Sequence, residues 1–389
     1  MTSAEQVLSR RDSAASLLLR HAWRPSPADL DVLRIWLLSR CAVLALTWPA
    51  EYILGHAASA RGWLSLWQNW DAVRLAAIAQ FGYFGPPGHA TADQVASPPG
   101  FPLVLAAVHA IARQWTVSGL IISFVAGAVA AVLLGRIAED GYGAGLGSRA
   151  VLFLVASPAA IFLAAGYSEA LFLALALGSW LAAGKQRWLP AVMLAGLASV
   201  VRVNGLFLCA ALVVQILLRA GGERLRAVAM FALALVPLGC YELYLRASTG
   251  NWLAWLHAEQ HGWERQFTSP VDTFKGTWAA AFGHEFPATV SFVFQLEIVA
   301  VLAGVLTTVA LLVVRRWAEA VYTGLTIGAM ATSVWYESVP RALLLLWPLW
   351  CGLAALSARR PWAGHLYLAL AIPVSVAIGL LYLTGNWAG

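Results

Sequence analysis

Long runs of apolar residues restrict this chain more than any other feature. Hydrophobic residues make up 60% of its 389 positions and charged residues only 11%, with a mean hydropathy of +0.73. A soluble domain is nearer half apolar and a quarter charged, and several runs here approach or exceed the roughly 20 apolar residues that cross a bilayer as a helix. The sequence therefore predicts an all-α polytopic membrane protein, with a single integral domain over residues 1–389.

The apolar runs alternate with polar connections along the whole chain. We expect the first span at about residues 35–54. Later apolar blocks cover residues 100–135, 150–184, 188–219, 225–245, 292–314, 318–335, 342–357 and 363–384. Because the first three of these blocks are each long enough for two crossings, the pattern predicts about 11 to 13 passes.

The net charge of +6 comes from basic residues that are dispersed in short connections and form no dense stripe. Such a distribution indicates membrane orientation and not nucleic-acid binding. The cysteines lie in apolar stretches without CxxC spacing, which is typical of buried small hydrophobes. They are Cys41, Cys209, Cys240 and Cys351.

A metal site is not expected. His257 and His261 would share a helix face, but Ala258 stands where the zinc-protease pattern requires Glu. We therefore expect no metal and no cofactor.

The basic connections predict the orientation of the chain. Cytoplasmic loops of membrane proteins carry an excess of Lys and Arg. We assign to the cytoplasm residues 1–29 and the pairs Lys185 and Arg187, Arg224 and Arg226, Arg315 and Arg316, and Arg359 and Arg360. The first external loop, 61–99, and a large one, 246–291, then lie outside. A split of 100–135 at Arg113 would reverse this parity, whereas a re-entrant piece near 99–103 would restore it, and both remain open.

The first external loop carries a carboxylate in an aromatic setting, Asp71 next to Trp70. Apolar residues recur there at helical spacing, while Gln68, Asp71 and Arg74 fall elsewhere, which predicts one or two amphipathic helices lying on the bilayer. The apolar set is Trp63, Leu66, Trp67, Trp70, Val73, Ala77, Ile78 and Phe81.

Five polar constellations interrupt the apolar background, and by the parity above most of them meet on one face. They are Asn69-Trp70-Asp71 with the following 81–83, the stretch 99–103, the stretch 157–169, the stretch 201–205, and 338–341 with the preceding 258–265. An ionisable group at membrane depth is a functional candidate because burying it unpaired is costly.

These constellations resemble the PIG-V type mannosyltransferases, which act in glycosylphosphatidylinositol assembly, and their bacterial relatives. The runs 158–172 and 202–205 are the most specific part of the likeness, which extends from about Gln68 to Pro348. The resemblance implies a GT-C fold, a polyprenyl-phosphate mannose donor and a site on the outer face. It also implies that Asp71 is the catalytic base. Ser97-Pro98 replaces the family's usual aromatic pair, which leaves the detailed loop shape open.

The chemistry of glycosyl transfer fits the residues independently. A base must reach the acceptor hydroxyl, and a carboxylate suffices because the transition state is oxocarbenium-like. A phosphate leaving group needs cationic donors, and Arg202 and Arg341 stand near the ends of hydrophobic segments. The remaining substrate-binding candidates are Asn69, Trp70, Arg74, Tyr83, Tyr167, Glu169, Asn204, Gln260, Trp263, Arg265 and Ser338.

Simpler roles stand beside several of these assignments. Asp71 would also suit a helix cap or a pair with Arg74, and Glu169 would suit the neutralisation of an arginine. Arg341 would suit snorkelling to the interface, and Tyr83 and Tyr167 would suit an aromatic belt.

The sequence thus predicts an inverting mannosyltransferase that acts on a lipid-linked acceptor. A non-enzymatic transporter or lipid flippase is the alternative from another class, although no internal repeat is evident. A GT-C enzyme that uses another polyprenyl-phosphate sugar is the alternative within the fold. The composition, rich in alanine and arginine, favours a bacterial plasma membrane with membrane lipids as neighbours, and the acceptor stays open.

Overall fold

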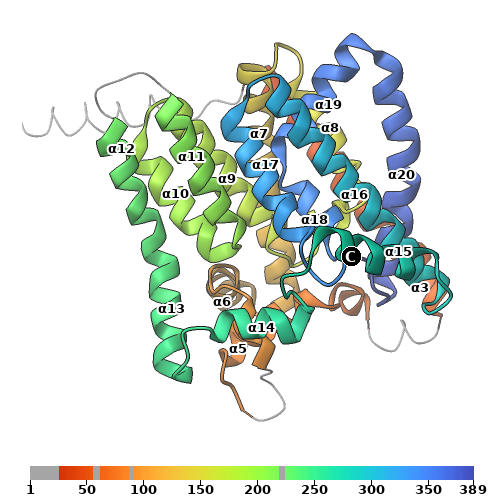
Figure 1. Cartoon of the computed structure of the whole chain (residues 1–389). Helices are drawn as coiled ribbons and strands as arrows, with labels where there is room; N and C mark the ends of the chain where they lie inside the picture. Colours follow the sequence, from red (N-terminus) through yellow and green to blue (C-terminus); the bar gives the residue numbers. More distant parts are fainter. Residues whose placement is uncertain (1–25, 56–61, 87–91, 219–223) are drawn as a thin grey trace, which may run out of the picture.

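The computed structural model of this protein describes residues 26–55, 62–86, 92–218 and 224–389, and within these ranges it is built of helices without a β-strand (Figure 1). The expected all-α membrane architecture is confirmed. Of the proposed cytoplasmic segment 1–29, only the last residues fall within the described ranges.

The helices follow one another through short connections. In chain order the α-helices are α2 (Pro27–Ala45), α3 (Thr47–Leu54), α5 (Asp71–Phe81), α6 (Gly100–Ala112), α7 (Trp115–Gly141), α8 (Gly147–Val155), α9 (Glu169–Gly184), α10 (Trp188–Val201), α11 (Asn204–Leu218), α12 (Arg224–Phe231), α13 (Val236–Thr249), α14 (Ala254–Trp263), α15 (Pro270–Phe282), α16 (Ala288–Val313), α17 (Trp317–Met330), α18 (Val339–Leu344), α19 (Trp347–Arg359) and α20 (Pro361–Leu383). Short 3-10 helices are η1 (Trp63–Trp67), η2 (Ala92–Ala96), η3 (Ala160–Leu163) and η4 (Ala232–Leu235).

Four helical segments of the described chain are long and apolar enough to cross a membrane. They are α7, the continuous stretch Arg224–Thr249, α16 and α20. Helices α6, α9, α10 and α11 are apolar but shorter. The expected number of about 11 to 13 passes therefore stays a prediction, because a helix shorter than about 17 residues does not by length alone span the hydrocarbon core.

The first span differs from its predicted position. Helix α2 begins at Pro27, because the Ser26 hydroxyl accepts the Asp29 amide at 3.1 Å and the Asp29 carboxylate accepts the Ser26 amide at 2.8 Å. This capping box starts the helix earlier than the apolar run indicates. The segment then breaks at Leu46, and α3 follows as a separate short helix.

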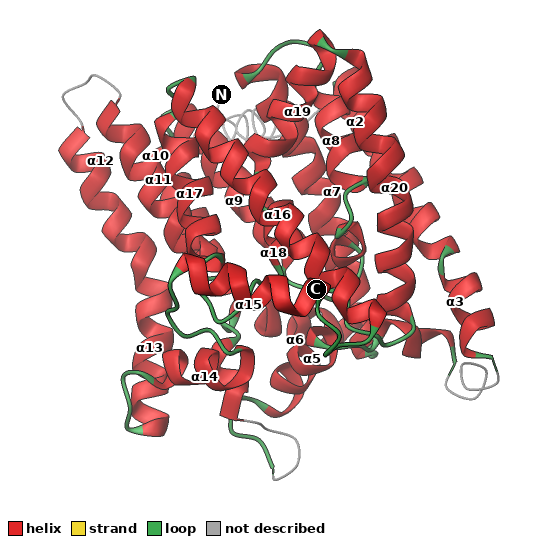
Figure 2. Cartoon of the chain, turned by 45° about the vertical axis from the view of Figure 1, so that its right-hand side comes forward, coloured by secondary structure: helices red, strands yellow, loops and turns green. Residues whose placement is uncertain are grey.

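The bundle has two chemically distinct ends. Lys185, Gly141 and Arg316 line one cavity, so the ends of α7 and α9 and the start of α17 lie together at what we call the basic end. Glu169 begins α9, and the 16 residues of this helix separate it from Lys185 by about 24 Å. Both views show α12 at the upper end and α14 and α5 at the lower end (Figures 1 and 2). The polar constellations thus lie opposite the basic loops.

Residues 100–135 do not form two crossings. Helix α6 has 13 residues and ends at Arg113, whose φ is 57°. Helix α7 begins beside the site, since the Gln68 amide donates to the Thr116 hydroxyl at 2.8 Å, and its last residue reaches the basic end. Helix α6 is therefore a short helix at the site end, an arrangement that agrees with the expected parity, and the parity itself stays a prediction.

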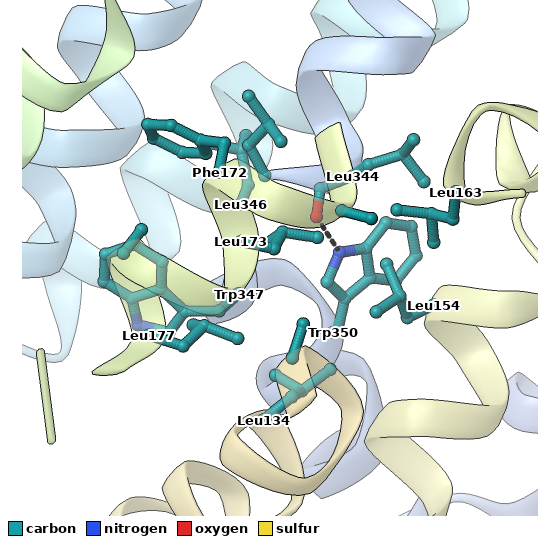
Figure 3. Close-up of a cluster of buried hydrophobic side chains, with 14 of the residues drawn as sticks. Leu134, Leu154, Leu163, Phe172, Leu173, Leu177, Leu344, Leu346, Trp347 and Trp350 are labelled. Carbon is teal, nitrogen blue, oxygen red and sulfur yellow. Dashed lines mark hydrogen bonds between the residues drawn. The ribbon is translucent and has the colours of Figure 1, made fainter. Parts of the chain in front are cut away.

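The main core packs α19 against α8, α9 and α7 (Figure 3). Trp347 stacks on Tyr322 with ring centroids 4.4 Å apart, and the Trp350 indole donates to the Leu344 carbonyl at 3.2 Å. Since Leu344 ends α18, this core anchors the helix that carries Arg341.

The cysteine prediction is half right. Cys209 and Cys351 are buried, but Cys41 on α2 and Cys240 on α13 are exposed, and Cys240 lines a cavity beside α5 and α6. The prediction failed for these two because an apolar neighbourhood in the sequence does not by itself show that a side chain faces the core.

Candidate active site

Four charged side chains from distant parts of the chain meet at the end of the bundle opposite the basic loops. The Arg341 guanidinium donates from Nη2 to Asp71 Oδ2 at 2.9 Å and from Nε to Glu169 Oε1 at 2.8 Å. Arg202 Nη1 donates to the same Glu169 oxygen at 3.1 Å. The four charges balance, and Arg341 bridges the two carboxylates.

Asp71 is the first residue of α5, where the helix dipole favours a negative charge. Its side chain keeps 25% of its surface accessible, so the carboxylate is open to a small substrate. The turn before it is held from α20 and the residues that follow it, because Asn69 donates to the Tyr382 carbonyl at 2.8 Å and the Trp70 indole donates to the Asn386 carbonyl at 3.1 Å. Asn69 and Trp70 therefore position the carboxylate.

Tyr167 lies in the connection that leads to Glu169 at the start of α9, and this connection packs very closely on α7. A Cβ atom on Gly119 would lie 2.8 Å from the Gly166 Cα, so both glycines are required for this approach. The Asp71 amide donates to the Tyr167 hydroxyl at 3.2 Å. Glu169 is completely buried, and its Oε2 has no hydrogen-bond partner among the described residues.

Arg202 and Asn204 stand at a sharp turn between α10 and α11. A side chain on Gly205 would collide with the backbone of Ser199, so only glycine allows the turn. Arg202 Nη1 donates to the Ser168 hydroxyl at 2.9 Å. Arg202 Nε and Asn204 Nδ2 are buried, and neither has a hydrogen-bond partner within the described chain.

Two cavities adjoin the cluster and share its central residues. The first, about 100 Å³, is lined by Arg202, Asn204 and Ser168, and we call it the arginine cavity. The second, about 210 Å³, is lined by Trp70, Arg74 and Glu337, and we call it the tryptophan cavity. Asp71, Trp263, Ser338 and Arg341 line both. The carboxylate thus lies between two compartments.

The electrostatics keep Asp71 ionised. Burial acts to raise the pKa of its carboxyl, but the positive charges of Arg341, Arg74 and Arg202 outweigh burial and hold the pKa below the ordinary value of 3.8. For Arg341, burial acts to lower the pKa, but the carboxylates of Glu169 and Asp71 raise it. Both groups are therefore charged at neutral pH.

The remaining sequence candidates fall at different distances from the cluster. Arg265 and Trp263 line the arginine cavity. Arg74 pairs with Asp93 at 2.9 Å and lies over the Trp263 ring, 4.2 Å from its centroid. Tyr83 lies apart, where its hydroxyl donates to the Ser97 carbonyl at 2.6 Å, and Gln260 lines neither cavity.

Three carboxylates near the site were not among the predicted site residues. Glu259, the neighbour of Gln260, lines the arginine cavity and pairs with Arg265 at 3.5 Å, because the helical turn of α14 faces it inward. Glu337 lines the tryptophan cavity, and burial raises the pKa of its carboxyl. The polar constellation 258–265 contains Glu259, and Glu337 directly precedes the constellation 338–341, so an acid inside or beside a predicted motif was the available signal.

The third of these carboxylates, Glu297, acts on Arg341 from a distance. It is fully buried in α16, and its two oxygens accept the amides of Ser338 and Val339 at 2.9 and 2.8 Å. These amides open α18, and Ser338 has a φ of 62°. Glu297 therefore fixes the start of the helix that carries Arg341.

The described residues contain no group of three or more His, Cys, Asp or Glu side chains placed to hold a metal ion. His261 Nδ1 lies 2.7 Å from the His257 carbonyl, and His257 Nδ1 lies 3.0 Å from Asn251 Nδ2. Local helix and turn contacts thus account for both histidines.

Comparison with known proteins gives one family match. Residues 62–229 match the family described as mannosyltransferase (PIG-V), which confirms the resemblance over a range that includes Asp71, Glu169 and Arg202. Arg341 and the segment 246–291 lie outside the matched range. No curated protein matches the chain. The family match supports glycosyl transfer as the class of reaction.

Among solved structures, the archaeal oligosaccharyltransferase AglB from Archaeoglobus fulgidus, in complex with an inhibitory peptide and a dolichol-phosphate, is similar at a TM-score of 0.43 and 12% identity. The alignment covers 84% of this chain and 52% of that one. This chain therefore spans about half the length of the archaeal protein.

Proposed function

We propose that this chain is an inverting GT-C mannosyltransferase of the PIG-V type, which transfers mannose from polyprenyl-phosphate mannose to a lipid-linked acceptor at the outer face of a bacterial plasma membrane. The observation that carries the proposal is the meeting of Asp71 with Arg341, Glu169 and Arg202 between two cavities, at the end opposite the basic loops. The positive-inside rule supports the external position of that end.

In the proposed reaction Asp71 is the general base. Its carboxylate accepts the proton of the acceptor hydroxyl while the hydroxyl oxygen attacks the anomeric carbon of the mannose. The bond from that carbon to the phosphate oxygen breaks, and the phosphate leaves with the electron pair. Attack from the face opposite the phosphate converts a β-linked donor into an α-mannoside.

The arginines have different roles in this scheme. Arg202 and Asn204 line the arginine cavity, and Arg202 Nε and Asn204 Nδ2 have no hydrogen-bond partner in the described chain, which supports a role for these two side chains as donors to the phosphate oxygens. Arg341 already bonds Asp71 and Glu169, so it holds the base ionised and oriented. Its charge also stabilises the departing phosphate.

The base assignment is tested with Asp71→Asn in purified, reconstituted protein supplied with radiolabelled polyprenyl-phosphate mannose and a bacterial lipid extract. We expect transfer to fall by about 10²- to 10⁴-fold, since this is the contribution of a positioned general base. The matched control is Asp272→Asn, because Asp272 is an exposed acid on α15. A folded Asp71→Asn protein with normal transfer contradicts the assignment.

The same vesicles separate transfer from transport. A transporter or flippase moves the labelled lipid across the bilayer without forming a new bond, whereas the enzyme produces a new mannosylated lipid. Competition by unlabelled polyprenyl-phosphate glucose or arabinose identifies the donor sugar. If one of these competitors abolishes transfer and unlabelled polyprenyl-phosphate mannose does not, the donor sugar is not mannose.

A further inference from the structure

Helix α5 separates two large cavities that the reaction scheme above leaves unassigned. One, about 500 Å³, lies on the side of Ile78 and Ala79 and reaches α6 and α13. The other, about 600 Å³, lies on the side of Ala77 and Gln80 and reaches the start of α7. We call the second the α5–α7 cavity. Ala77 and Ala79 stand two positions apart on α5 and face different cavities.

The two cavities differ in chemistry. The one near Ala79 is lined by prolines, aliphatic side chains and tyrosine rings. The α5–α7 cavity combines aromatic surfaces with amide and hydroxyl groups. Its polar and aromatic lining includes Trp67, Trp70, Trp115, Gln68, Gln80 and Thr116.

This combination suits a sugar head group. The C–H faces of a pyranose ring are apolar and pack on aromatic rings, which are large flat apolar surfaces. Amide side chains both donate and accept, so they match hydroxyl groups that do the same. A bare hydrocarbon chain would gain nothing from the amides, because it would strip them of water without replacing their hydrogen bonds.

The α5–α7 cavity also leads to the base. Trp70 and Arg74 line both it and the tryptophan cavity, which contains Asp71. Arg74 is held in place by Asp93 at 2.9 Å and by the ring of Trp263. A hydroxyl that arrives past Trp70 and Arg74 therefore reaches Asp71 through the tryptophan cavity, which Arg202 does not line, and an approach separate from the phosphate site suits attack opposite the phosphate.

We infer that the α5–α7 cavity binds the sugar-bearing head group of the acceptor lipid and delivers its hydroxyl to Asp71. The inference rests on the proposed function for the identity of the reaction. It adds the place and the chemical class of the second substrate.

The test compares Ala77→Phe with Ala79→Phe, since each fills a different cavity from the same helix. The probe is octyl α-mannoside that carries a photoreactive diazirine on its alkyl chain. In the wild-type protein we expect crosslinks to peptides that contain residues 72–81 and 115–119. Labelling falls at least tenfold in Ala77→Phe and stays unchanged in Ala79→Phe. Gln80→Leu removes an amide at nearly constant volume, and we expect it to lower labelling severalfold. This variant keeps the test decisive if Ala77→Phe misfolds.

Three outcomes overturn the inference. Labelling that Ala77→Phe and Gln80→Leu leave intact places the probe elsewhere. Equal loss in Ala79→Phe means that the effect is not specific to this cavity. Equal labelling by octanol with the same diazirine shows a lipid slot without sugar recognition.

Transfer assays in the same preparation distinguish this site from the reaction. We expect Ala77→Phe to raise the KM for octyl mannoside at least tenfold while the KM for the polyprenyl-phosphate donor stays unchanged. Wild-type protein that is labelled but transfers no mannose contradicts the proposed function. Wild-type protein that transfers mannose without labelling in this cavity contradicts the site.

Discussion

The two ends of the helical bundle use charge in opposite ways. At the basic end, Arg136 binds both oxygens of the buried Asp29, at 3.1 and 3.0 Å, and Arg316 binds Glu319 and the Gly141 carbonyl. At the site end, Arg341 and Arg202 converge on one oxygen of Glu169 while the other oxygen has no partner in the described chain. Complete pairs hold structure together, whereas incomplete ones leave donors and acceptors for a substrate.

Substitution of Arg202 is expected to have the largest effect among the tests of this difference between the two ends. In Arg202→Gln the charged donor to the phosphate is lost, and a hydrogen bond to a charged group contributes about 1.5 to 3 kcal/mol. We expect the KM for the donor lipid to rise by roughly 10- to 100-fold. Arg202→Lys retains the positive charge but lacks the planar guanidinium, so we expect its donor KM to lie between those of the wild type and Arg202→Gln. Steady-state kinetics measure the donor KM of each variant. An unchanged donor KM in Arg202→Gln would show that Arg202 does not bind the phosphate.

Glu297 is expected to matter less, since it acts through Arg341. Glu297→Gln replaces one acceptor of the Ser338 and Val339 amides with a donor, so the start of α18 shifts. We expect kcat to fall by about tenfold with a smaller change in the donor KM, because misplacement of the base weakens the transition state.

Gln295→Leu is the matched control for Glu297, because it removes a hydrogen bond from α16 to the Ala281 carbonyl at 3.0 Å and not to α18. Equal losses of kcat in the two variants would make Glu297 a general structural residue.

A change in pH tests the charge balance at the site end. Asp71 acts as a base only when ionised, and Arg74 is among the charges that hold its pKa below 3.8. In Arg74→Gln the pKa rises, so the acid limb of kcat/KM moves to higher pH and activity at pH 4 to 5 falls severalfold relative to pH 7. Lys275→Gln, at an exposed cation on α15, leaves the limb in place. If the acid limb of kcat/KM in Arg74→Gln stays at the same pH or moves to lower pH, Asp71 is not the base whose ionisation limits the reaction.

The smallest effect on activity is expected at the basic end. Arg136→Met leaves Asp29 buried without its partner, and because Arg136 is 37% exposed and screened by solvent, we expect a loss of only about 1 kcal/mol of stability. Thermal unfolding in detergent measures this loss. Transfer kinetics stay as in the wild type, and a reduced kcat would mean that the two ends are coupled.

Much of this cluster was predictable because polar residues stand out in an apolar chain. Asp71, Glu169, Arg202 and Arg341 lie far apart in sequence, yet each interrupts or borders an apolar run. The alternation of basic loops then placed them at one end. In a membrane protein, a charged residue in an apolar sequence therefore indicates roughly where along the bundle that residue lies.

The unpredicted parts depend on contacts that no local pattern encodes. Glu297 reads as a single acid inside an apolar helix, and its partners are main-chain amides 41 and 42 positions later. The apolar pattern of the first external loop predicted the helices but not their buried faces. Trp63, Trp70 and Val73 are largely exposed, while Trp67, Leu75 and Ile78 are buried. Packing of η1 against α3 and α7, and of α5 against α6 and α7, decides these faces.

The hydrogen bonds that tie Asn69 and Trp70 to α20 have a consequence for biosynthesis. They join residues 313 and 316 positions apart, so the partners emerge from the ribosome long after the loop itself. Because domains form as the chain is made, Asn69 and Trp70 lack these two bonds until the last part of the chain is present, whereas Gln68 and Asp71 can bond Thr116 and Tyr167 earlier. The turn that carries Asp71 therefore gains its last two hydrogen bonds only when α20 and the residues after it are in place.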